Sequence, residues 1–188
     1  MFSLACGYFN TWSTRREVRL LLLGLSNAGK TTILEQLKSM YKRKNPLPFH
    51  KIQPTVGLNI VELQFRTIKA VVWDVGGSEK FRPVWEKYYQ DINAVLFVVD
   101  SNDMECLPSA KRVLKEVVGH PDLCETPVLI LANKQDLNSS LPLEVVEAML
   151  DVDGALKDRP FHVQACSAYT RNGIEAAFFW LIKQMRRN

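Results

Sequence analysis

The chain of 188 residues lacks the features that mark several large classes of protein. Its four cysteines, Cys6, Cys106, Cys124 and Cys166, form no CxxC pair, which predicts reduced thiols rather than a disulfide framework or a zinc site. No apolar run reaches the ~18 residues of a transmembrane helix. The first residues lack the basic region of a secretory signal. The sequence therefore favours an intracellular chain without membrane-spanning helices.

A strong excess of one charge is also missing. The 24 Lys and Arg residues against 20 Asp and Glu leave a net charge of +4, and no basic tract is long enough to line a nucleic-acid groove. We therefore expect no nucleic-acid partner. Hydrophobic residues make up 47% of the chain, which is enough for a folded core, and the length suits one main domain.

Apolar runs and helix-like segments alternate along the chain. Most of the runs are nearly continuously hydrophobic, as expected for strands covered on both faces, and they lie at 18–24, 69–75, 93–100, 126–133 and 161–167. The helix-like segments between them lie at about 30–42, 105–118, 142–152 and 172–187. This order predicts a doubly wound α/β fold, with helices on both faces of a mostly parallel sheet.

One strand and one loop differ from this pattern. Residues 61–66 alternate between apolar and polar side chains, which predicts a sixth strand at the edge of the sheet. We expect it to pair antiparallel with 69–75 through a short turn near Thr67 and Ile68. Segment 43–57 holds three prolines and no periodicity, so it is predicted to be a long loop with a functional role.

The stretch GLSNAGKTT, from Gly24 to Thr32, fits the pattern G-x-x-x-x-G-K-[ST], with a strand before it and a helix after it. The glycines let successive main-chain N–H groups point at phosphate oxygens, and the helix adds its positive N-terminal end. Lys30 would contact the β- and γ-phosphates, and the Thr31 hydroxyl would ligate Mg²⁺. The predicted site for a nucleotide polyphosphate comprises Gly24, Ser26, Asn27, Ala28, Gly29, Lys30, Thr31 and Thr32.

The stretch NKQD, Asn133 to Asp136, follows a predicted strand and indicates the base. Asp136 can accept hydrogen bonds from N1–H and the exocyclic amine of guanine, which adenine does not offer, and such a site discriminates by on the order of 10⁴. The Lys134 stem can lie over the base, and Asn133 can tie this loop to the phosphate loop. Main-chain N–H groups for the guanine carbonyl oxygen are expected from Cys166, Ser167 and Ala168.

Three residues are expected to sense the terminal phosphate. Asp74, in WDVGG at a strand end, can hold Mg²⁺ through water, and the Gly77 N–H can meet the γ-phosphate. Thr55, near the end of the long loop, is the candidate for a second Mg²⁺ hydroxyl. GTP would order both segments and GDP would release them.

Taken together, the stretches GLSNAGKTT, PTVGLNIVE, WDVGGSEKFRPVW, YYQDINAVLFVVDSND and LANKQD resemble the small GTPases of the ADP-ribosylation factor (Arf) and Arf-like family. The resemblance covers nearly the whole chain, and the first twelve residues, together with EQLK and TVGLNI, are most similar to the Arf-related subgroup. It implies a P-loop NTPase of the small G domain type over 17–188, with a six-stranded sheet, and an N-terminal amphipathic helix and linker over 1–16.

The resemblance also implies a function and partners. It implies a GDP/GTP switch that uses GTP, GDP and Mg²⁺ and recruits effectors in vesicle traffic. The implied partners are an exchange factor, a GTPase-activating protein and effectors. The implied location is the cytoplasm and the Golgi or trans-Golgi membrane, as a peripheral membrane protein. We expect a monomer.

Two positions depart from the family pattern. Ser26 stands where the family has aspartate, and Ser78 stands where it has the glutamine that orients the attacking water. Serine is too short for that role, and loss of a water-positioning group costs ~10²–10⁴ in rate. With Lys30 and Ser78 at the catalytic positions, we expect slow hydrolysis. A GTP-binding scaffold with negligible hydrolysis is an alternative, and a P-loop small-molecule kinase is another, although no lid with catalytic arginines is visible.

The N-terminal segment is predicted to bind a membrane. On a helical wheel Phe2, Ala5, Phe9 and Trp12 share one face. Phe2 stands where N-myristoylation needs glycine, so that modification is excluded. Packing of this helix on the domain is the alternative to membrane contact, and the resemblance implies both, docked with GDP and released with GTP.

An exposed effector patch is predicted beside the switch segments. Leu58 and Ile60 share parity with the polar face of the edge strand, and they can join Trp73 and Tyr88 there. A core position for Trp73 is the alternative. By resemblance, the strand pair 58–75 slides by two residues when GTP binds, and a two-residue slide keeps every side chain on its face.

Overall fold

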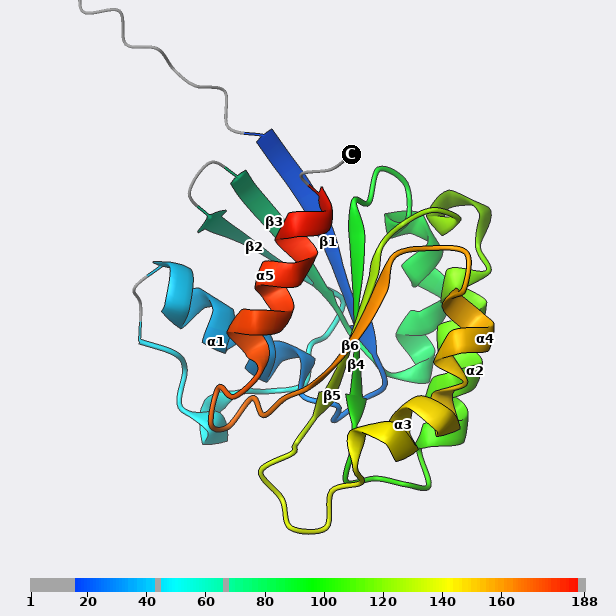
Figure 1. The fold of residues 1–188 in the computed structure, drawn as a ribbon. Helices are drawn as coiled ribbons and strands as arrows, with labels where there is room; N and C mark the ends of the chain where they lie inside the picture. Colours follow the sequence, from blue (N-terminus) through cyan, green and yellow to red (C-terminus); the bar gives the residue numbers. More distant parts are fainter. Residues whose placement is uncertain (1–15, 43–44, 66–67, 186–188) are drawn as a thin grey trace, which may run out of the picture.

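The computed structural model describes residues 16–42, 45–65 and 68–185. Six strands form one sheet in the order β2-β3-β1-β4-β5-β6 (Figure 1). Their bounds are β1 Arg16–Gly24, β2 Leu58–Phe65, β3 Ile68–Val75, β4 Ala94–Asp100, β5 Val128–Asn133 and β6 Phe161–Ala165. β2 pairs antiparallel with β3, and the other neighbours are parallel. The predicted fold class is confirmed.

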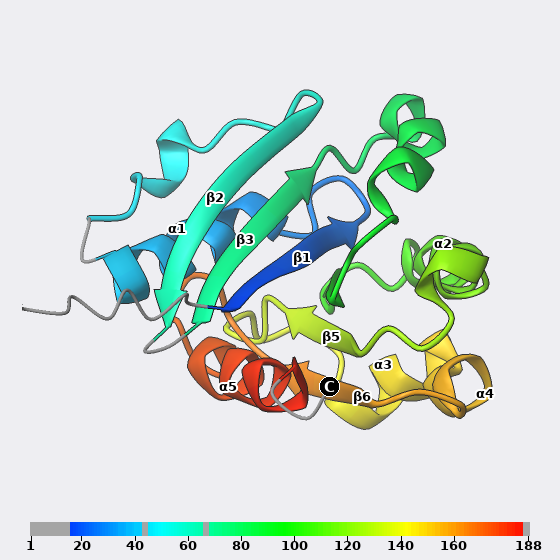
Figure 2. The ribbon, with the colours of Figure 1, turned by 90° about the horizontal axis from the view of Figure 1, so that it is seen from above.

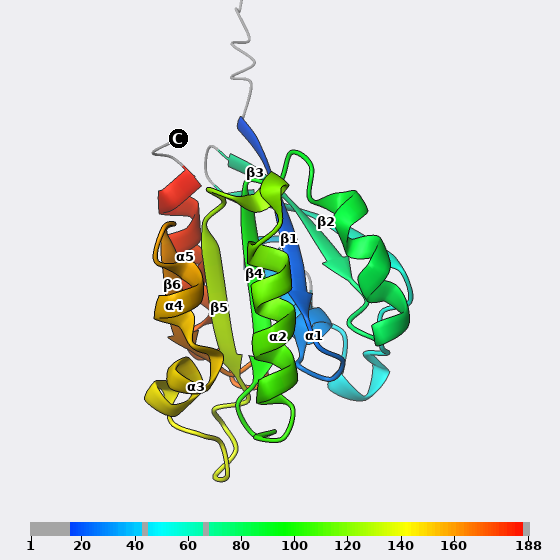
Figure 3. The same ribbon diagram turned by 90° about the vertical axis from the view of Figure 1, so that its right-hand side faces the viewer.

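Helices cover both faces of the sheet (Figure 2). α1 and α5 lie on one face, and α2, α3 and α4 lie on the other, where α2 runs beside the strands in Figure 3. The α-helices are α1 Lys30–Lys42, α2 Leu107–Val118, α3 Leu143–Leu150, α4 Val152–Leu156 and α5 Ile174–Met185. Three 3₁₀ segments are η1 Phe49–Lys51, η2 Glu79–Tyr88 and η3 Pro121–Leu123. None of the described helices is both long and apolar enough to cross a bilayer.

Strand β1 shows why the core forms on both sides. Leu20 and Leu22 are fully buried in the cluster that includes residues of α1 and α5, whereas Leu21 and Leu23 are fully buried in the cluster that includes residues of α2. Successive strand side chains point to opposite faces, so a continuous leucine run fills both clusters. Each buried side chain contributes about 1.5–3 kcal/mol relative to exposure.

The edge strand β2 behaves as its alternation predicts. Val61 and Leu63 are buried on the α1 and α5 side, while Glu62 and Gln64 are exposed. Leu58 lies opposite Val75 in the antiparallel register. The predicted turn falls at 66–67, which lie outside the described residues, and Ile68 already belongs to β3.

The predicted helix over 142–152 is wrong in its extent, because the chain forms two helices. Asp151 has φ 55° and ends α3 in the left-handed conformation, and α4 follows at once. Aspartate tolerates this conformation better than most residues. Lys115 and Lys111 on α2 contact the Asp151 carboxylate at 2.8 and 3.5 Å, and they hold its pKa below its usual value.

The segment η2 was not predicted. It follows Ser78 directly and contains Pro83. Proline has no backbone N–H to donate and usually interrupts a helix, so the sequence did not indicate a helix here. Its buried Trp85 donates from Nε1 to the Gly76 oxygen at 3.0 Å, which ties η2 to the end of β3. Two predicted strands also proved shorter, since β5 begins at Val128 and β6 ends at Ala165.

The N-terminal boundary differs slightly from the expected one. β1 begins at Arg16, so this residue is part of the sheet rather than of a linker. The predicted amphipathic helix, with Phe2, Ala5, Phe9 and Trp12, lies outside the described residues.

Candidate functional site

The phosphate loop connects β1 to α1 and needs its glycines. Gly24 has φ +139°, and a Cβ there would lie 2.2 Å from the Val98 oxygen. Gly29 has φ +95°, and a Cβ there would lie 2.2 Å from Asn133 Nδ2. Both positions combine a backbone conformation that favours glycine with a close neighbour. The loop therefore curls against β4 and the NKQD segment.

Lys30 lies across the mouth of this loop. Its Nζ donates to the Gly24 oxygen at 2.9 Å and to the Leu25 oxygen at 2.8 Å. Burial lowers the pKa of Lys30 to about 8, the Asp74 carboxylate opposes this shift, and the nearby Arg82 charge adds to it. A polyphosphate would stabilise the charged form, so the ammonium is placed to gain from an anion.

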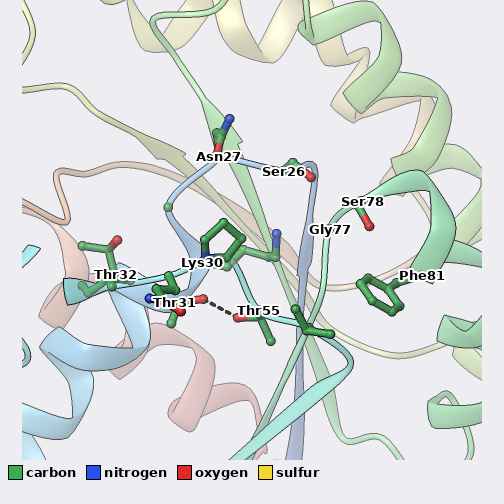
Figure 4. A pocket seen from close by; sticks show the side chains of 14 residues that line it. Ser26, Asn27, Lys30, Thr31, Thr32, Thr55, Gly77, Ser78 and Phe81 are labelled. Atoms are coloured by element: carbon green, nitrogen blue, oxygen red, sulfur yellow. Dashed lines mark hydrogen bonds between the residues drawn. The ribbon is translucent and has the colours of Figure 1, made fainter. Parts of the chain in front are cut away.

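Three hard oxygen atoms meet beside Lys30. Thr31 Oγ1 lies 2.7 Å from Thr55 Oγ1 (Figure 4), and both hydroxyls donate to Asp74 Oδ2, at 2.9 and 3.0 Å. Burial raises the pKa of Asp74, and the two hydroxyl bonds oppose this shift. Asp74 Oδ1 is buried and has no hydrogen-bond partner within the described segments. The predicted Mg²⁺ residues are thus brought together from α1, the long loop and β3.

A pocket of about 370 Å³ opens above these oxygens. Figure 4 shows Ser26 and Ser78 on one side of Lys30, with Thr31 and Thr55 on the other. Gly77 lies against the loop, where a Cβ would come within 2.4 Å of Lys30 Nζ and 2.5 Å of the Gly24 oxygen. The predicted residues that line this pocket are Ser26, Asn27, Gly29, Lys30, Thr31, Thr32, Thr55, Gly77 and Ser78.

Five lining residues of this pocket were not predicted. They are Ile52, Gln53, Pro54, Val56 and Phe81. The first four belong to the long loop, whose missing periodicity already suggested function. Phe81 comes from η2, where Phe81, Trp85 and Tyr88 follow a helical spacing that could have revealed this element.

A second pocket of about 240 Å³ is lined by Asn133, Lys134 and Asp136 and shares Gly29 and Thr32 with the first. Asn133 is buried and connects three segments. Its Nδ2 donates to the Ala28 oxygen at 2.8 Å, and its Oδ1 accepts from the Ala168 N–H at 2.9 Å. The expected link between the base loop and the phosphate loop is therefore present.

Asp136 and Lys134 are both held in place at this second pocket. Ser167 Oγ donates to Asp136 Oδ1 at 2.5 Å, which leaves Oδ2 and a second lone pair on Oδ1 for a ligand. Lys134 has φ 70°, and its Nζ lies 2.5 Å from Asp100 Oδ2. Lys134 lines the pocket, and the ion pair with Asp100 holds its ammonium.

The main-chain groups of Cys166, Ser167 and Ala168 differ from the expectation. Their N–H groups donate to the Ala132 oxygen at 2.9 Å, the Asn172 oxygen at 3.0 Å and Asn133 Oδ1 at 2.9 Å. A guanine carbonyl would therefore have to share the Ala168 N–H with Asn133. Burial raises the pKa of the Cys166 thiol to about 12, so this thiol stays protonated.

The residues of the predicted effector patch lie on one face of the sheet. Ile60 is 53% exposed and lies opposite Trp73 in the register of β2 and β3. The Trp73 and Tyr88 rings meet edge to face at 5.7 Å, and Leu58 packs partly buried beside the same cluster. Trp73 is partly buried and packs against the cluster that includes residues of α2, and its buried Nε1 has no hydrogen-bond partner among the described residues.

This geometry agrees with comparisons to known proteins. The model of the ADP-ribosylation factor family matches residues 7–185. The chain belongs to this family. Membership in the Arf family implies guanine-nucleotide binding and partners among regulators and effectors.

Individual relatives match over most of this Arf-family chain. The human "ADP-ribosylation factor-related protein 1" is 38% identical over 190 residues, covering 100% of this chain and 94% of the relative. The "ADP-ribosylation factor-like protein 3" of Caenorhabditis elegans is 40% identical over 172 residues, covering 91% and 89%. A solved structure of the Trypanosoma brucei Arl6 BBS3 small GTPase with bound GppNp has a TM-score of 0.82 and 32% identity, covering 91% of this chain and 98% of that one.

Proposed function

We propose that this Arf-family chain binds GTP and GDP with Mg²⁺ and acts as a slowly hydrolysing switch in membrane traffic. The observation that carries the proposal is the cluster of Thr31, Thr55 and Asp74 oxygens next to the Lys30 ammonium. The phosphate pocket and the base pocket share Gly29 and Thr32, so one crevice offers both an anion site and a base site.

The donor set fits magnesium. Mg²⁺ prefers oxygen ligands and keeps several waters, and the cluster offers two hydroxyls and a carboxylate with a free buried oxygen. The described residues contain no group of three or more His, Cys, Asp or Glu side chains that could hold a metal alone. The remaining ligands would come from phosphate and water. When bound, the ion would neutralise charge on the phosphate oxygens.

Guanine is the base that the second pocket fits. Asp136 keeps acceptor capacity toward the pocket, while Ser167 holds its carboxylate in position. Guanine offers two donors to that carboxylate, whereas adenine would leave it unpaired. The solved Trypanosoma brucei relative has GppNp bound, and this guanine nucleotide analogue supports the same assignment here.

Slow hydrolysis follows from Ser78. The residue lines the phosphate pocket beside Gly77, at the position where the family pattern has glutamine. The serine side chain is two bonds shorter than that of glutamine, so its hydroxyl cannot reach the same attacking water. The expected loss is ~10²–10⁴ in rate. Lys30 remains placed to stabilise phosphate charge. Serine at position 78 should therefore slow hydrolysis without weakening nucleotide binding.

The same observation favours a second candidate function. If hydrolysis is negligible, the chain is a GTP-binding scaffold whose state changes by nucleotide exchange. Ser78 in the phosphate pocket supports this candidate as well. The hydrolysis rate measured with bound GTP separates the two functions.

Membrane attachment is proposed for the N-terminal segment. Residues 1–16 carry the apolar face Phe2, Ala5, Phe9 and Trp12, and the likeness to an Arf-related protein supports a peripheral role at Golgi or trans-Golgi membranes. Ile60 and Trp73 would contact effectors, and a two-residue slide of β2 and β3 would couple them to the nucleotide. Deletion of residues 2–12 should abolish GTP-dependent recruitment to liposomes, and unchanged recruitment would exclude this segment as the anchor.

Titration calorimetry with GTP, GDP and ATP, with and without Mg²⁺, tests the nucleotide assignment. GTP and GDP should bind, ATP should bind at least about 10³-fold more weakly, and removal of Mg²⁺ should weaken GTP binding. Equal affinity for ATP would contradict the assignment of the base pocket.

A further inference from the structure

Two exposed aromatic side chains meet at the base pocket. Phe49 is 44% exposed and Tyr169 is 66% exposed, yet their ring centroids are only 5.0 Å apart, with the planes tilted by 34°. Both rings line the pocket that holds Lys134 and Asp136. Neither residue belongs to the motifs that predict nucleotide binding. The nucleotide-binding motifs therefore do not explain why these two rings meet at the base pocket.

Tyr169 is on a firmly held loop. The Ala168 N–H before it donates to Asn133 Oδ1 at 2.9 Å, and the Thr170 N–H after it donates to Ser167 Oγ at 3.0 Å. Ser167 also donates to Asp136. Tyr169 thus has a fixed position relative to the carboxylate that would bind the base.

Phe49 is on the long loop that leads to the phosphate end. A single 3₁₀ turn holds its main chain, with the Ile52 N–H donating to the Phe49 oxygen at 3.1 Å. Six residues later Thr55 contacts Thr31 and Asp74. Between them Gln53 and its neighbours line the phosphate pocket. One short stretch of chain therefore runs from the base pocket to the phosphate pocket.

We propose that Phe49 and Tyr169 form an aromatic latch that closes over the base end of a bound guanine nucleotide and slows its release. The proposal rests on the proposed function and adds a regulation to it. Contacts that hold Thr55 also restrict Phe49, because only five residues separate them and Pro54 stiffens the stretch. A nucleotide with a terminal phosphate keeps the latch closed, whereas one without it leaves Thr55 and then Phe49 free to move away.

Nucleotide release measures the latch directly. The full chain is loaded with fluorescent GDP or with the fluorescent non-hydrolysable triphosphate GppNp in Mg²⁺, and release is followed after an excess of unlabelled nucleotide is added. Phe49→Ala and Tyr169→Ala should each speed GppNp release about 3- to 10-fold, the size expected for an aromatic pair. The double variant should be little faster than either single variant, because each removes the same contact.

Matched variants distinguish loss of the latch from a general loss of stability. Leu47→Ala removes a 48% exposed side chain two residues before Phe49 and should leave release unchanged. Tyr169→Phe keeps the ring and should stay within about twofold of the unmodified chain. Thr55→Ala should speed GppNp release, and adding Phe49→Ala to it should have little further effect.

Each other result overturns a defined part of the proposal. Unchanged GppNp release in Phe49→Ala and Tyr169→Ala excludes the latch while leaving nucleotide binding intact. Fully additive effects show that the two rings act separately, which also excludes it. Equal acceleration of GDP and GppNp release excludes the coupling to Thr55. If the unmodified chain retains neither nucleotide, the proposed function itself fails.

Discussion

At the base end of the crevice, Asn133 and Asp136 are each bonded to other parts of the protein, whereas at the phosphate end Asp74 keeps a buried oxygen without a partner in the described segments. At the first end, hydrogen bonds within the protein already hold both side chains in place, and Asp136 keeps acceptor capacity for a base. The second has unmet polar capacity and a buried ammonium, which a metal ion and a polyphosphate would complete. One site thus joins a base end held by internal hydrogen bonds to a phosphate end with unmet polar capacity.

The two ends also differ from the family pattern to different degrees. NKQD and the glycines of the phosphate loop are intact, and the structure gives each of them a close contact. The two serines that depart from the pattern, Ser26 and Ser78, both line the phosphate pocket. On the proposed function, the chain would bind nucleotide as its family does and hydrolyse GTP more slowly.

The largest expected effect is at the base end. Asp136→Ala should lower the preference for GTP over ATP by on the order of 10³–10⁴, because the carboxylate that pairs with guanine is gone. Calorimetry with both nucleotides measures this ratio. Asp153→Ala, which removes an exposed carboxylate of α4, is the matched control and should leave the ratio unchanged. A preserved preference in Asp136→Ala would place guanine recognition elsewhere.

A smaller effect is expected from a methyl group at the phosphate end. In Gly77→Ala the Cβ would lie 2.4 Å from Lys30 Nζ and 2.7 Å from the Leu25 carbonyl carbon, so the chain must shift away from the loop. Such overpacking costs about 1–3 kcal/mol, and we expect GTP affinity to fall about 10- to 100-fold. GDP affinity should change less, since Gly77 is assigned to the terminal phosphate. Equal losses for both nucleotides would contradict that assignment.

The smallest expected effect concerns the support of the phosphate end. Trp85→Phe removes the hydrogen bond from Nε1 to the Gly76 oxygen at 3.0 Å but keeps a buried ring. The loss should lower the free energy of unfolding by about 1–2 kcal/mol, and guanine selectivity should not change. Denaturant unfolding and the GTP/ATP ratio measure the two quantities. A change in selectivity would show that the two ends are not separate.

Much of the fold was predictable because local sequence decides it. A strand covered on both faces must be apolar throughout, so β1 and β4 stand out, and the alternation in β2 identifies an edge. The split between α3 and α4 was missed because a left-handed Asp151 is stabilised by lysines of α2, which are far away in sequence. Pro83 concealed η2 for a similar reason, since Trp85 and Gly76 hold that segment.

The candidate site also has parts that local sequence predicts and parts that depend on tertiary contacts. Gly29, Lys30 and Thr31 are adjacent in one motif, so their place in one pocket could be predicted from spacing alone. The contact between Phe49 and Tyr169 depends on two loops that meet only in the folded chain. The N–H groups of Cys166, Ser167 and Ala168 were expected to face a ligand, and only the structure shows that protein acceptors already take them.

Single-turnover hydrolysis of bound GTP tests most directly the proposal that this chain binds GTP but hydrolyses it slowly. The unmodified chain should cleave its GTP about 10²-fold more slowly than Ser78→Gln, because the glutamine restores a group that can position water. Ser78→Ala should match the unmodified chain, since the serine hydroxyl does not reach that water. An unmodified chain that cleaves bound GTP as fast as Ser78→Gln would contradict the account.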